Sequence, residues 1–455
     1  MLLQEIEGEI SFPHNTALSL DFFERQLAAK LGNGVIPFRF VVSEIAEGRC
    51  KFEAGGFANS CLNHEDNLFD FRVRQFESQG SFNAVLLIPT GIGAELGGHA
   101  GDAGPVARLF AGICDTLVIH PNVVNASDIN EQPENALYVE GSLLTRMLMG
   151  SVGLRRVRSN RVLVVIDDHE DDYFVNSAVN SVNAARAAYG LNSAEVVCLN
   201  PPVSMRARFS TSGRAAGRVE SLEVLWNLLE SRKGDFDAVA LSSVIDVPSD
   251  FHQGYFDAYG EMVNPWGGVE ALLSHAVSTY FNVPSAHSPM FENATIANHN
   301  PGIVDARMAA EAVSVTFLQC ILKGLMKSPR VIRDSKHFVS PDVFSAEDVS
   351  CLVIPDGCVG LPTFAAIEQR MPVIAVRSNN NILCNDLSML PWAENQLFYV
   401  DSYFEAAGLM CAIKAGLDPR SCERPLANTR VSQFGSKSSF EDAQQERDAA
   451  RSHTR

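Results

Sequence analysis

The sequence predicts an α/β protein with mostly parallel, doubly wound sheets and a small N-terminal α+β module. Two observations predict the parallel sheets. From residue 83 onward, short apolar segments alternate with amphipathic ones, which is the β-α-β order of a sheet with helices on its faces. The apolar segments, such as Val162–Ile166, also lack the polar alternation of a half-exposed strand. Strands covered on both faces have this character.

The individual elements follow from apolar runs and helical spacing. Residues 16–31 have helical spacing, and residues 36–42 and 48–55 alternate in part, which indicates a small module at 1–80. We divide the rest into a main α/β domain at 81–345, a β-α-β unit at 346–422 and a polar tail at 423–455 that is either disordered or a solvated helix. We expect strands at 84–89, 116–120, 162–166, 195–199, 238–241, 351–354 and 373–376, and helices at 105–114, 173–189, 220–230, 269–281, 307–326 and 364–369.

Composition excludes several classes of protein. The 455 residues carry a formal charge of −18 and are 46% hydrophobic, as in a globular protein. Nucleic-acid and anionic membrane surfaces need clustered Lys and Arg, so we expect neither partner. No apolar run reaches about 18 residues, and the acidic start shows no secretory signal. The ten cysteines form no CxxC pair, which indicates free thiols in a reducing cytoplasm.

A glycine-rich segment from Ile88 to Pro105 runs between a predicted strand and a predicted helix. Glycine permits close backbone approach, and free N–H groups at a helix start attract anions. The spacing fits neither G-x-G-x-x-G nor a lysine-bearing P-loop, so it does not specifically indicate NAD or ATP. His99 and Asp102 suit an acid/base pair, with a structural turn as the alternative. We expect anion binding by Gly91, Gly93, Gly97, Gly98 and Gly101.

Polar residues also follow the next two predicted strands. The carboxyl ends of parallel strands meet at one edge of a sheet, which is where ligands bind. We therefore expect His120 to act in catalysis and Asn122, Asn125 and Asp128 to bind substrate, with Asx turns and a helix cap as the alternative. The acidic segment 167–172 suits either a divalent cation or a helix cap, and we prefer the cap.

Two segments further along the chain extend the predicted site. Gly267 and Gly268 begin a helix and offer a second anion nest. His287 lies between two prolines, a rigid setting for a general acid or base, although a structural histidine fits equally well.

The remaining candidates lie on later helices. Arg307 either clamps a carboxylate or phosphate or pairs with Glu311 four residues on. Gly360 and Thr363 shape a helix start that suits an anion. Cys358 beside them is either a reactive thiol or, as we prefer, a small structural residue.

Six longer motifs, each occurring once, are spread along the chain. They are Pro89-Thr-Gly-Ile-Gly-Ala, Gly97-Gly-His-Ala-Gly-Asp-Ala-Gly-Pro, His120-Pro-Asn-Val-Val-Asn-Ala-Ser-Asp-Ile-Asn, Asn264-Pro-Trp-Gly-Gly-Val-Glu, Ala286-His-Ser-Pro-Met and Asp356-Gly-Cys-Val-Gly-Leu-Pro-Thr. Together they resemble an uncharacterised bacterial and plant family catalogued as domain of unknown function 3326. The resemblance spans about residues 35–400 and implies no particular reaction.

A weaker resemblance is to GT-B glycosyltransferases and UDP-sugar 2-epimerases. It rests on Gly97-Gly-His before a helix and on the later Gly360-Leu-Pro-Thr unit. It implies two nucleotide-sugar half-sites, but Thr363 stands where those folds carry a ribose-binding Glu.

These observations favour a cytoplasmic metabolic enzyme that acts on a small carboxylate or phosphate by acid/base chemistry. His99, Asp102, His120 and His287 are the candidate catalytic residues. A nucleotide-sugar transferase or epimerase, and a non-catalytic ligand-binding or assembly protein, are the alternatives. The sequence indicates no particular cofactor or metal, and it leaves a homo-oligomer open.

Overall fold

The structure is a computed structural model. It describes residues 1–31, 34–58, 67–124, 132–248, 251–314, 317–429, 431–432 and 434. The chain divides into two compact units, Met1–Met410 and Cys411–Arg455. In the second unit, the described residues include the end of helix α13 (Tyr403–Lys414) and a 3-10 turn at Pro419–Cys422, and most of the predicted tail at 423–455 lies outside the described residues. Everything below concerns the first unit.

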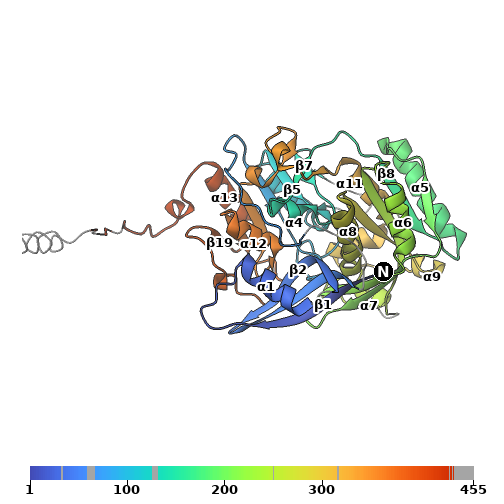
Figure 1. Ribbon diagram of the computed structural model, residues 1–455, viewed down its shortest axis with the longest axis horizontal. Helices are drawn as coiled ribbons and strands as arrows, with labels where there is room; N and C mark the ends of the chain where they lie inside the picture. Colours follow the sequence, from blue (N-terminus) through green and yellow to red (C-terminus); the bar gives the residue numbers. More distant parts are fainter. Residues whose placement is uncertain are drawn as a thin grey trace, which may run out of the picture. The chain divides into compact units, whose positions relative to one another are not determined.

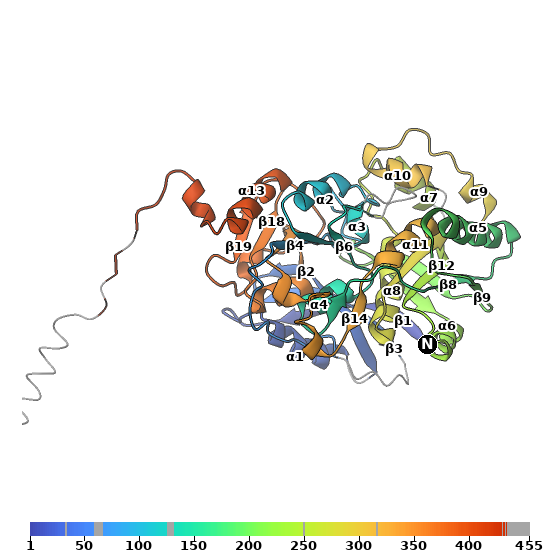
Figure 2. The ribbon, with the colours of Figure 1, turned by 90° about the horizontal axis from the view of Figure 1, so that it is seen from above.

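A fully parallel sheet of six strands is formed by residues between 83 and 400. Its order is β19, β18, β16, β4, β5, β6. Figure 2 labels β19, β18, β4 and β6 of this sheet. Every residue of β4, β5, β16 and β18 is buried, as their apolar runs predict. The strands are β4 (Asn83–Leu86), β5 (Thr116–Ile119), β6 (Ala136–Tyr138), β16 (Cys351–Pro355), β18 (Val373–Val376) and β19 (Leu397–Val400).

The second sheet joins the N-terminal strands to the middle of the chain. Its order is β17, β2, β3, β1, β11, β10, β12, β8, β9. Strand β13 also pairs with β12, along the residues of β12 that pair with β8. Pairing is antiparallel from β17 to β10 and parallel around β12. The strands are β1 (Leu2–Ser11), β2 (Val35–Ala46), β3 (Arg49–Ala58), β8 (Val162–Asp167), β9 (Val196–Leu199), β10 (Ser204–Phe209), β11 (Ala215–Glu220), β12 (Ala238–Asp246), β13 (Ser285–Met290) and β17 (Val359–Gly360).

The predicted N-terminal module is not confirmed as a separate unit. Strand β1 pairs with β11, where Leu3 lies opposite Val219. Helix α1 (Leu20–Leu31) packs near α12 (Leu361–Glu368), with the rings of Phe23 and Phe364 4.8 Å apart (Figure 1). The mixed α/β class with parallel strands is confirmed.

Two hydrophobic cores lie on opposite faces of the second sheet. Successive residues of β12 belong alternately to one core and to the other. Val239 and Leu241 belong to the core under α8, whereas Ala238 and Ala240 belong to the core under α5 and α11. Alternate residues of a strand point to opposite faces. The helices are α2 (Gly104–Ala111), α3 (Pro121–Val124), α4 (Leu143–Leu148), α5 (Asp172–Tyr189), α6 (Glu223–Ser231), α7 (Phe251–Asp257), α8 (Gly267–Phe281), α9 (Ala294–Ala297), α10 (Ala309–Val313) and α11 (Phe317–Lys327).

The segment predicted as one helix at 307–326 is interrupted. A 3-10 turn at Ala306–Met308 leads into α10, and Ser314 then adopts an extended conformation before α11. A third, small sheet has the order β14 (Arg330–Ile332), β7 (Gly153–Arg155), β15 (Val343–Phe344). Among the described residues no single helix has the length and apolar composition to cross a membrane. One pair of helical segments with a bend between them, Ala306–Val313 and Phe317–Lys327, has this length and composition only when the two are counted together.

Candidate functional site

Two adjoining cavities lie at the carboxyl ends of β4, β5 and β6. The first, of about 390 Å³, is lined by Arg39, Arg146, Arg214 and Arg333, and we call it the arginine cavity. The second, of about 310 Å³, is lined by Tyr255, Phe256, Trp266, Phe291 and Phe317, and we call it the aromatic cavity. Both volumes suit a small organic ligand. The two share the residues Thr90, Pro121, Asn122, Gly267, Glu270, His287 and Ile321, which therefore form a partition between them.

His120 lies where β5 ends and lines the arginine cavity. Its Nε2 accepts a hydrogen bond of 3.0 Å from the Ile88 N–H, so the neutral ring carries its proton on Nδ1. Burial lowers the pKa of His120 to about 4. His120 is therefore a neutral hydrogen-bond donor at physiological pH.

Asn122 ties the end of β5 to the segment after β4. Its amide donates to the Ile88 carbonyl and to Thr90 Oγ1, both at 2.9 Å. These bonds fix the strand ends that line both cavities.

A chain of three side chains runs through the partition. Glu270, near the start of α8, lies 3.0 Å from Nδ1 of His287, and Nε2 of His287 lies 2.7 Å from Ser243 Oγ. His287 is on β13 and Ser243 on the neighbouring β12, and both side chains are buried. Because a carboxylate accepts from Nδ1–H, Nε2 accepts from the serine hydroxyl. Glu270 is partly exposed, and Ser243 lines neither cavity.

Two further carboxyl groups, Glu140 and Glu311, lie near Glu270. Glu140 follows β6 in the arginine cavity, where burial, with a contribution from the charge of Glu270, raises its pKa to about 8. The Tyr138 hydroxyl donates to Glu140. Glu311 lines the aromatic cavity, and burial raises its pKa too. The three carboxyl groups lie close enough for the charge of Glu270 to act on both others.

His275 completes the wall of the arginine cavity from within α8. Burial, Arg39 and His120 together lower the pKa of His275 to about 3. It is therefore uncharged at physiological pH, and the positive charge of this cavity comes from its arginines.

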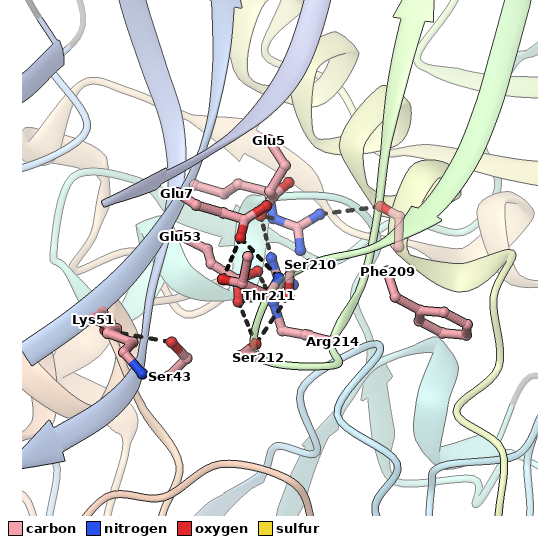
Figure 3. Close-up of polar contacts among 12 residues, drawn as sticks. Glu5, Glu7, Ser43, Lys51, Glu53, Phe209, Ser210, Thr211, Ser212 and Arg214 are labelled. Atoms are coloured by element: carbon pink, nitrogen blue, oxygen red, sulfur yellow. Dashed lines mark hydrogen bonds and ion pairs between the residues drawn. The ribbon is translucent and has the colours of Figure 1, made fainter. Parts of the chain in front are cut away.

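Arg39 is held by a buried ion cluster between the N-terminal strands and the turn from β10 to β11. Figure 3 shows Glu5 and Glu53 facing Arg214. Arg214 Nε donates to Glu53 at 2.7 Å, and Arg214 also pairs with Glu5. Arg39 Nε lies 3.7 Å from Glu5, and Arg39 Nη1 donates to the Gly268 carbonyl at 3.3 Å. Among the described residues, the other guanidinium N–H groups of Arg39 make no protein hydrogen bond.

The charges of this cluster depend on one another. Burial alone would raise the pKa of Glu5, but Arg39 and Arg214 hold it below its usual value. Burial conversely lowers the pKa of Arg39. Ser210 and Ser212 donate to Glu53 from the turn, at 2.9 and 2.5 Å (Figure 3).

His99 belongs to a hydrogen-bond network in the aromatic cavity. Its Nδ1 lies 2.9 Å from the Tyr255 hydroxyl, which lies 2.7 Å from Glu311 Oε2. Burial and Arg307 lower the pKa of His99. Glu311 Oε1 accepts from the Ala100 N–H at 2.6 Å, so the network also braces the glycine-rich segment.

His99 and Asp102 have separate hydrogen-bond partners. No hydrogen bond joins the two among the described residues; instead, Asp102 accepts from the Gly97 N–H at 2.6 Å. Burial raises the pKa of Asp102 to about 7. Gly97 has a φ of +81°, and a Cβ on Gly98 would lie 2.0 Å from the Ala94 carbonyl oxygen, so this turn requires both glycines.

The structure brings together many of the predicted site residues. His120, Gly360 and Thr363 line the arginine cavity; Gly91, Gly97, Gly98 and His99 line the aromatic cavity; and Asn122, Gly267 and His287 line both. Five others line neither cavity: Gly93, Gly101, Asp102, Gly268 and Arg307. Asn125 and Asp128 lie outside the described residues. The catalytic and binding roles of all these residues remain predictions.

The structure bears on two of the open alternatives. Among the described residues Arg307 makes no ion pair with Glu311; it pairs instead with Asp305 and Glu95, at 2.9 and 2.8 Å. In the acidic segment, Asp171 caps α5 by accepting from the Tyr173 N–H. No set of three His, Cys, Asp or Glu residues in the described part of the chain is arranged to hold a metal ion.

Several residues of the site were not predicted. Arg39, Glu140, Ser243, Glu270, His275 and the Tyr255–Glu311 pair carry no signal beyond residue type. Glu270 ends one of the long motifs, which is the one clue to it. Cys358 lines the arginine cavity, where burial raises its thiol pKa well above the usual value, so it is protonated.

Comparisons with known proteins agree with the stronger resemblance. The family model described as "Protein of unknown function (DUF3326)" matches residues 83–423. A Synechococcus protein named an uncharacterized lipoprotein is 31% identical over 343 residues, which cover 74% of this chain and 92% of that protein. No solved structure matches. The resemblance to GT-B enzymes is not supported. The chain therefore belongs to the DUF3326 family of proteins of unknown function.

Proposed function

We propose that the protein is a cytoplasmic enzyme that moves a proton on a small carboxylate or phosphate metabolite. The observation that carries the proposal is the hydrogen-bonded pair of Glu270 and His287, which lines both cavities. Glutamate and histidine are the commonest groups for general acid/base catalysis. Their place at the junction of two cavities gives a substrate access to them.

The strand order supports a doubly wound sheet with its ligand crevice here. From β4 the chain proceeds through β5 to β6 on one side, and from β16 through β18 to β19 on the other. The order therefore reverses between β4 and β16. In open parallel sheets, ligands bind outside the carboxyl ends of the strands at such a reversal. The glycine-rich segment after β4 and Cys358 after β16 lie at this point.

The arginine cavity is suited to the anionic part of the substrate. The side chain of Arg39 is 12% exposed, and it has guanidinium N–H groups without a protein hydrogen-bond partner among the described residues. An arginine with free donors binds carboxylate or phosphate strongly in a desolvated site. Its nearest carboxylate, Glu5, is shared with Arg214.

Proton transfer would be performed by Glu270. His287 donates to Glu270, and Ser243 fixes the tautomer of His287, so the Glu270 carboxylate is oriented. His120, with its proton on Nδ1, would stabilise negative charge that develops on the substrate. A proton next to a carbonyl or carboxyl group is the one that such an arrangement suits best.

Hydrogen exchange in D₂O tests the proposal without knowledge of the product. The purified protein is incubated with a panel of small carboxylates and phosphate esters, and ¹H NMR follows the loss of C–H signals. We expect exchange on at least one compound, and we expect Glu270→Gln to abolish it while Glu261→Gln, an exposed control, retains it. Binding without exchange would instead favour the non-catalytic alternative.

The order Ser243–His287–Glu270 also supports a second candidate, acyl transfer with Ser243 as nucleophile. The two hydrogen bonds have the connectivity of a serine hydrolase triad. However, Ser243 is 3% exposed and lines neither cavity. Covalent labelling by a fluorophosphonate that is lost in Ser243→Ala would favour this candidate, and no labelling would exclude it.

The location in the cytoplasm is part of the proposal. The part of the chain that the structure describes contains no disulfide, as expected in a reducing compartment. The Synechococcus relative is named a lipoprotein, and a lipid anchor would place that protein at a membrane. Fractionation of cells that carry the tagged full-length chain decides between the two, since recovery with membranes would contradict a cytoplasmic location.

A further inference from the structure

The aromatic cavity differs from the arginine cavity in charge. Among the described residues that line it there is no Lys or Arg, whereas Glu270, Glu292 and Glu311 contribute three carboxyl groups. Burying a carboxylate without a cation is costly unless donors or a ligand compensate it. The cavity is therefore unsuited to an anion and suited to a positive group.

Aromatic side chains form much of its wall. Trp266 and Tyr255 meet edge to face, with their ring centroids 5.3 Å apart. The ring centroids of Phe291 and Phe317 lie 6.3 Å apart. Phe291 directly follows β13, and Phe317 is the first residue of α11. Trp266 and both phenylalanines are only partly buried. Partly exposed rings around a cavity bind ammonium groups through the negative charge of their π faces.

Glu311 accepts hydrogen bonds from backbone and side-chain donors. It accepts from the Ala100 N–H at 2.6 Å and from the Tyr255 hydroxyl at 2.7 Å, and Asn264 lies 3.4 Å away. Burial raises its pKa, and a bound cation would offset that effect. Glu292 has a side chain 30% exposed, beside His252 at 3.3 Å.

A second observation also points to a ligand. Ser288 lines this cavity, and its hydroxyl oxygen is buried without a hydrogen-bond partner among the described residues. Buried hydroxyl groups are rarely left without a partner.

We propose that the aromatic cavity binds an organic cation, a protonated or quaternary ammonium group, next to the anion-binding cavity. The ammonium group would lie among the aromatic rings and face Glu311 and Glu292. This site stands on the lining of the aromatic cavity, and so it does not require the proposed reaction. With both cavities occupied, Glu270 and His287 would lie between a cationic and an anionic ligand, or between the two ends of one zwitterion.

Three ligands of nearly equal size test the charge preference. Benzylamine, benzyl alcohol and benzoate are titrated into the full-length protein by isothermal calorimetry, with benzyltrimethylammonium as a quaternary probe. We expect at least one ammonium probe to bind at least tenfold more tightly than benzyl alcohol. If no ammonium probe binds at millimolar concentration, or if benzyl alcohol binds as tightly, the proposal is overturned.

Two variants locate the binding site. Trp266→Leu and Glu292→Gln are each expected to weaken the ammonium probe tenfold or more, whereas the exposed controls Tyr259→Leu and Glu261→Gln are expected to leave it unchanged. Thermal unfolding confirms that each variant is folded. An affinity that survives both cavity variants in folded protein would place the ligand elsewhere and overturn the proposal. Deuterium exchange is a separate measurement, so either proposal can fail alone.

Discussion

The arginine cavity and the aromatic cavity share a partition but are built in opposite ways. The arginine cavity is lined by four arginines, of which Arg39 and Arg214 belong to a buried ion cluster, and its His120 and His275 are uncharged. The aromatic cavity has carboxyl groups that accept from neutral donors, and no Lys or Arg is among its described residues. Each wall thus supplies the charge that a complementary ligand would need. Adjacent cavities of opposite character are typical of a site that discriminates between two groups.

The ion cluster gives the largest expected effect. Arg214→Met leaves Glu5 and Glu53 buried without their main partner, which destabilises a protein by about 3–5 kcal/mol. We expect urea unfolding to show this loss, and benzoate binding to fall more than benzylamine binding in protein that is still folded. The control Arg218→Met breaks an exposed pair with Glu220 and should change stability by less than about 1 kcal/mol. If Arg214→Met and Arg218→Met lost equal free energy of unfolding, the buried ion cluster would contribute no more to stability than an exposed ion pair.

Glu140, in the arginine cavity, gives a pH dependence of stability. Its pKa rises from an ordinary 4.5 to about 8 through burial and the charge of Glu270, against the hydrogen bond from Tyr138. Between these values the native state keeps a proton that the unfolded state has lost. Stability from this group is therefore present below pH 4.5 and falls as pH rises toward 8, by about 1.4 kcal/mol per pH unit.

The variant Glu140→Gln removes that titration. Its stability relative to the parent should rise across the same window, as measured by urea unfolding at several pH values. A constant difference would show that Glu140 is ionised in the native state.

Arg39 tests the anion site directly. Arg39→Met removes a charge-assisted hydrogen bond of about 1.5–3 kcal/mol, so benzoate or inorganic phosphate should bind at least tenfold more weakly. Benzylamine affinity should not change, because Arg39 does not line the aromatic cavity. A parallel loss of both affinities would remove the distinction between the two cavities.

Thr363 gives the smallest effect. Its hydroxyl donates to the Cys358 carbonyl at 2.9 Å, so Thr363→Val should lower the free energy of unfolding by about 1 kcal/mol. If Thr363 serves only the start of α12, anion affinity is unchanged in the same calorimetric titration. A weaker anion affinity would support the predicted binding role.

How much could be predicted differs between the fold and the site. Continuous apolar runs such as Val373–Val376 correctly gave the parallel strands. The hairpin of β10 and β11 was missed, although residues 204–209 alternate polar and apolar side chains; the two strands are short and carry Arg206, Arg208 and Arg218 in place of a continuous apolar run. Without this hairpin, the pairing of β1 with β11 could not be foreseen.

In the site, residues after a clear apolar strand and residues in glycine- or proline-containing motifs could be found, whereas Glu140, Arg39 and Arg214 could not. His120 follows β5, whose apolar run is clear, whereas Glu140 follows β6, which has three residues. Arg39 and Arg214 are far apart in sequence and meet only through the order of the second sheet. Local periodicity carries no information about such contacts.

The pairing of β1 with β11 has a consequence for synthesis of the chain on the ribosome. Strands β1 to β3 leave the ribosome early, but roughly 160 residues separate β3 from β11. At about 5–20 residues per second, the outer edge of β1 stays unpaired for on the order of ten to thirty seconds. During that time Glu5 has no Arg214 to pair with, and an open strand edge is a template for association with other chains. A nascent chain of this protein is therefore a natural client for chaperones until the turn with Arg214 has emerged.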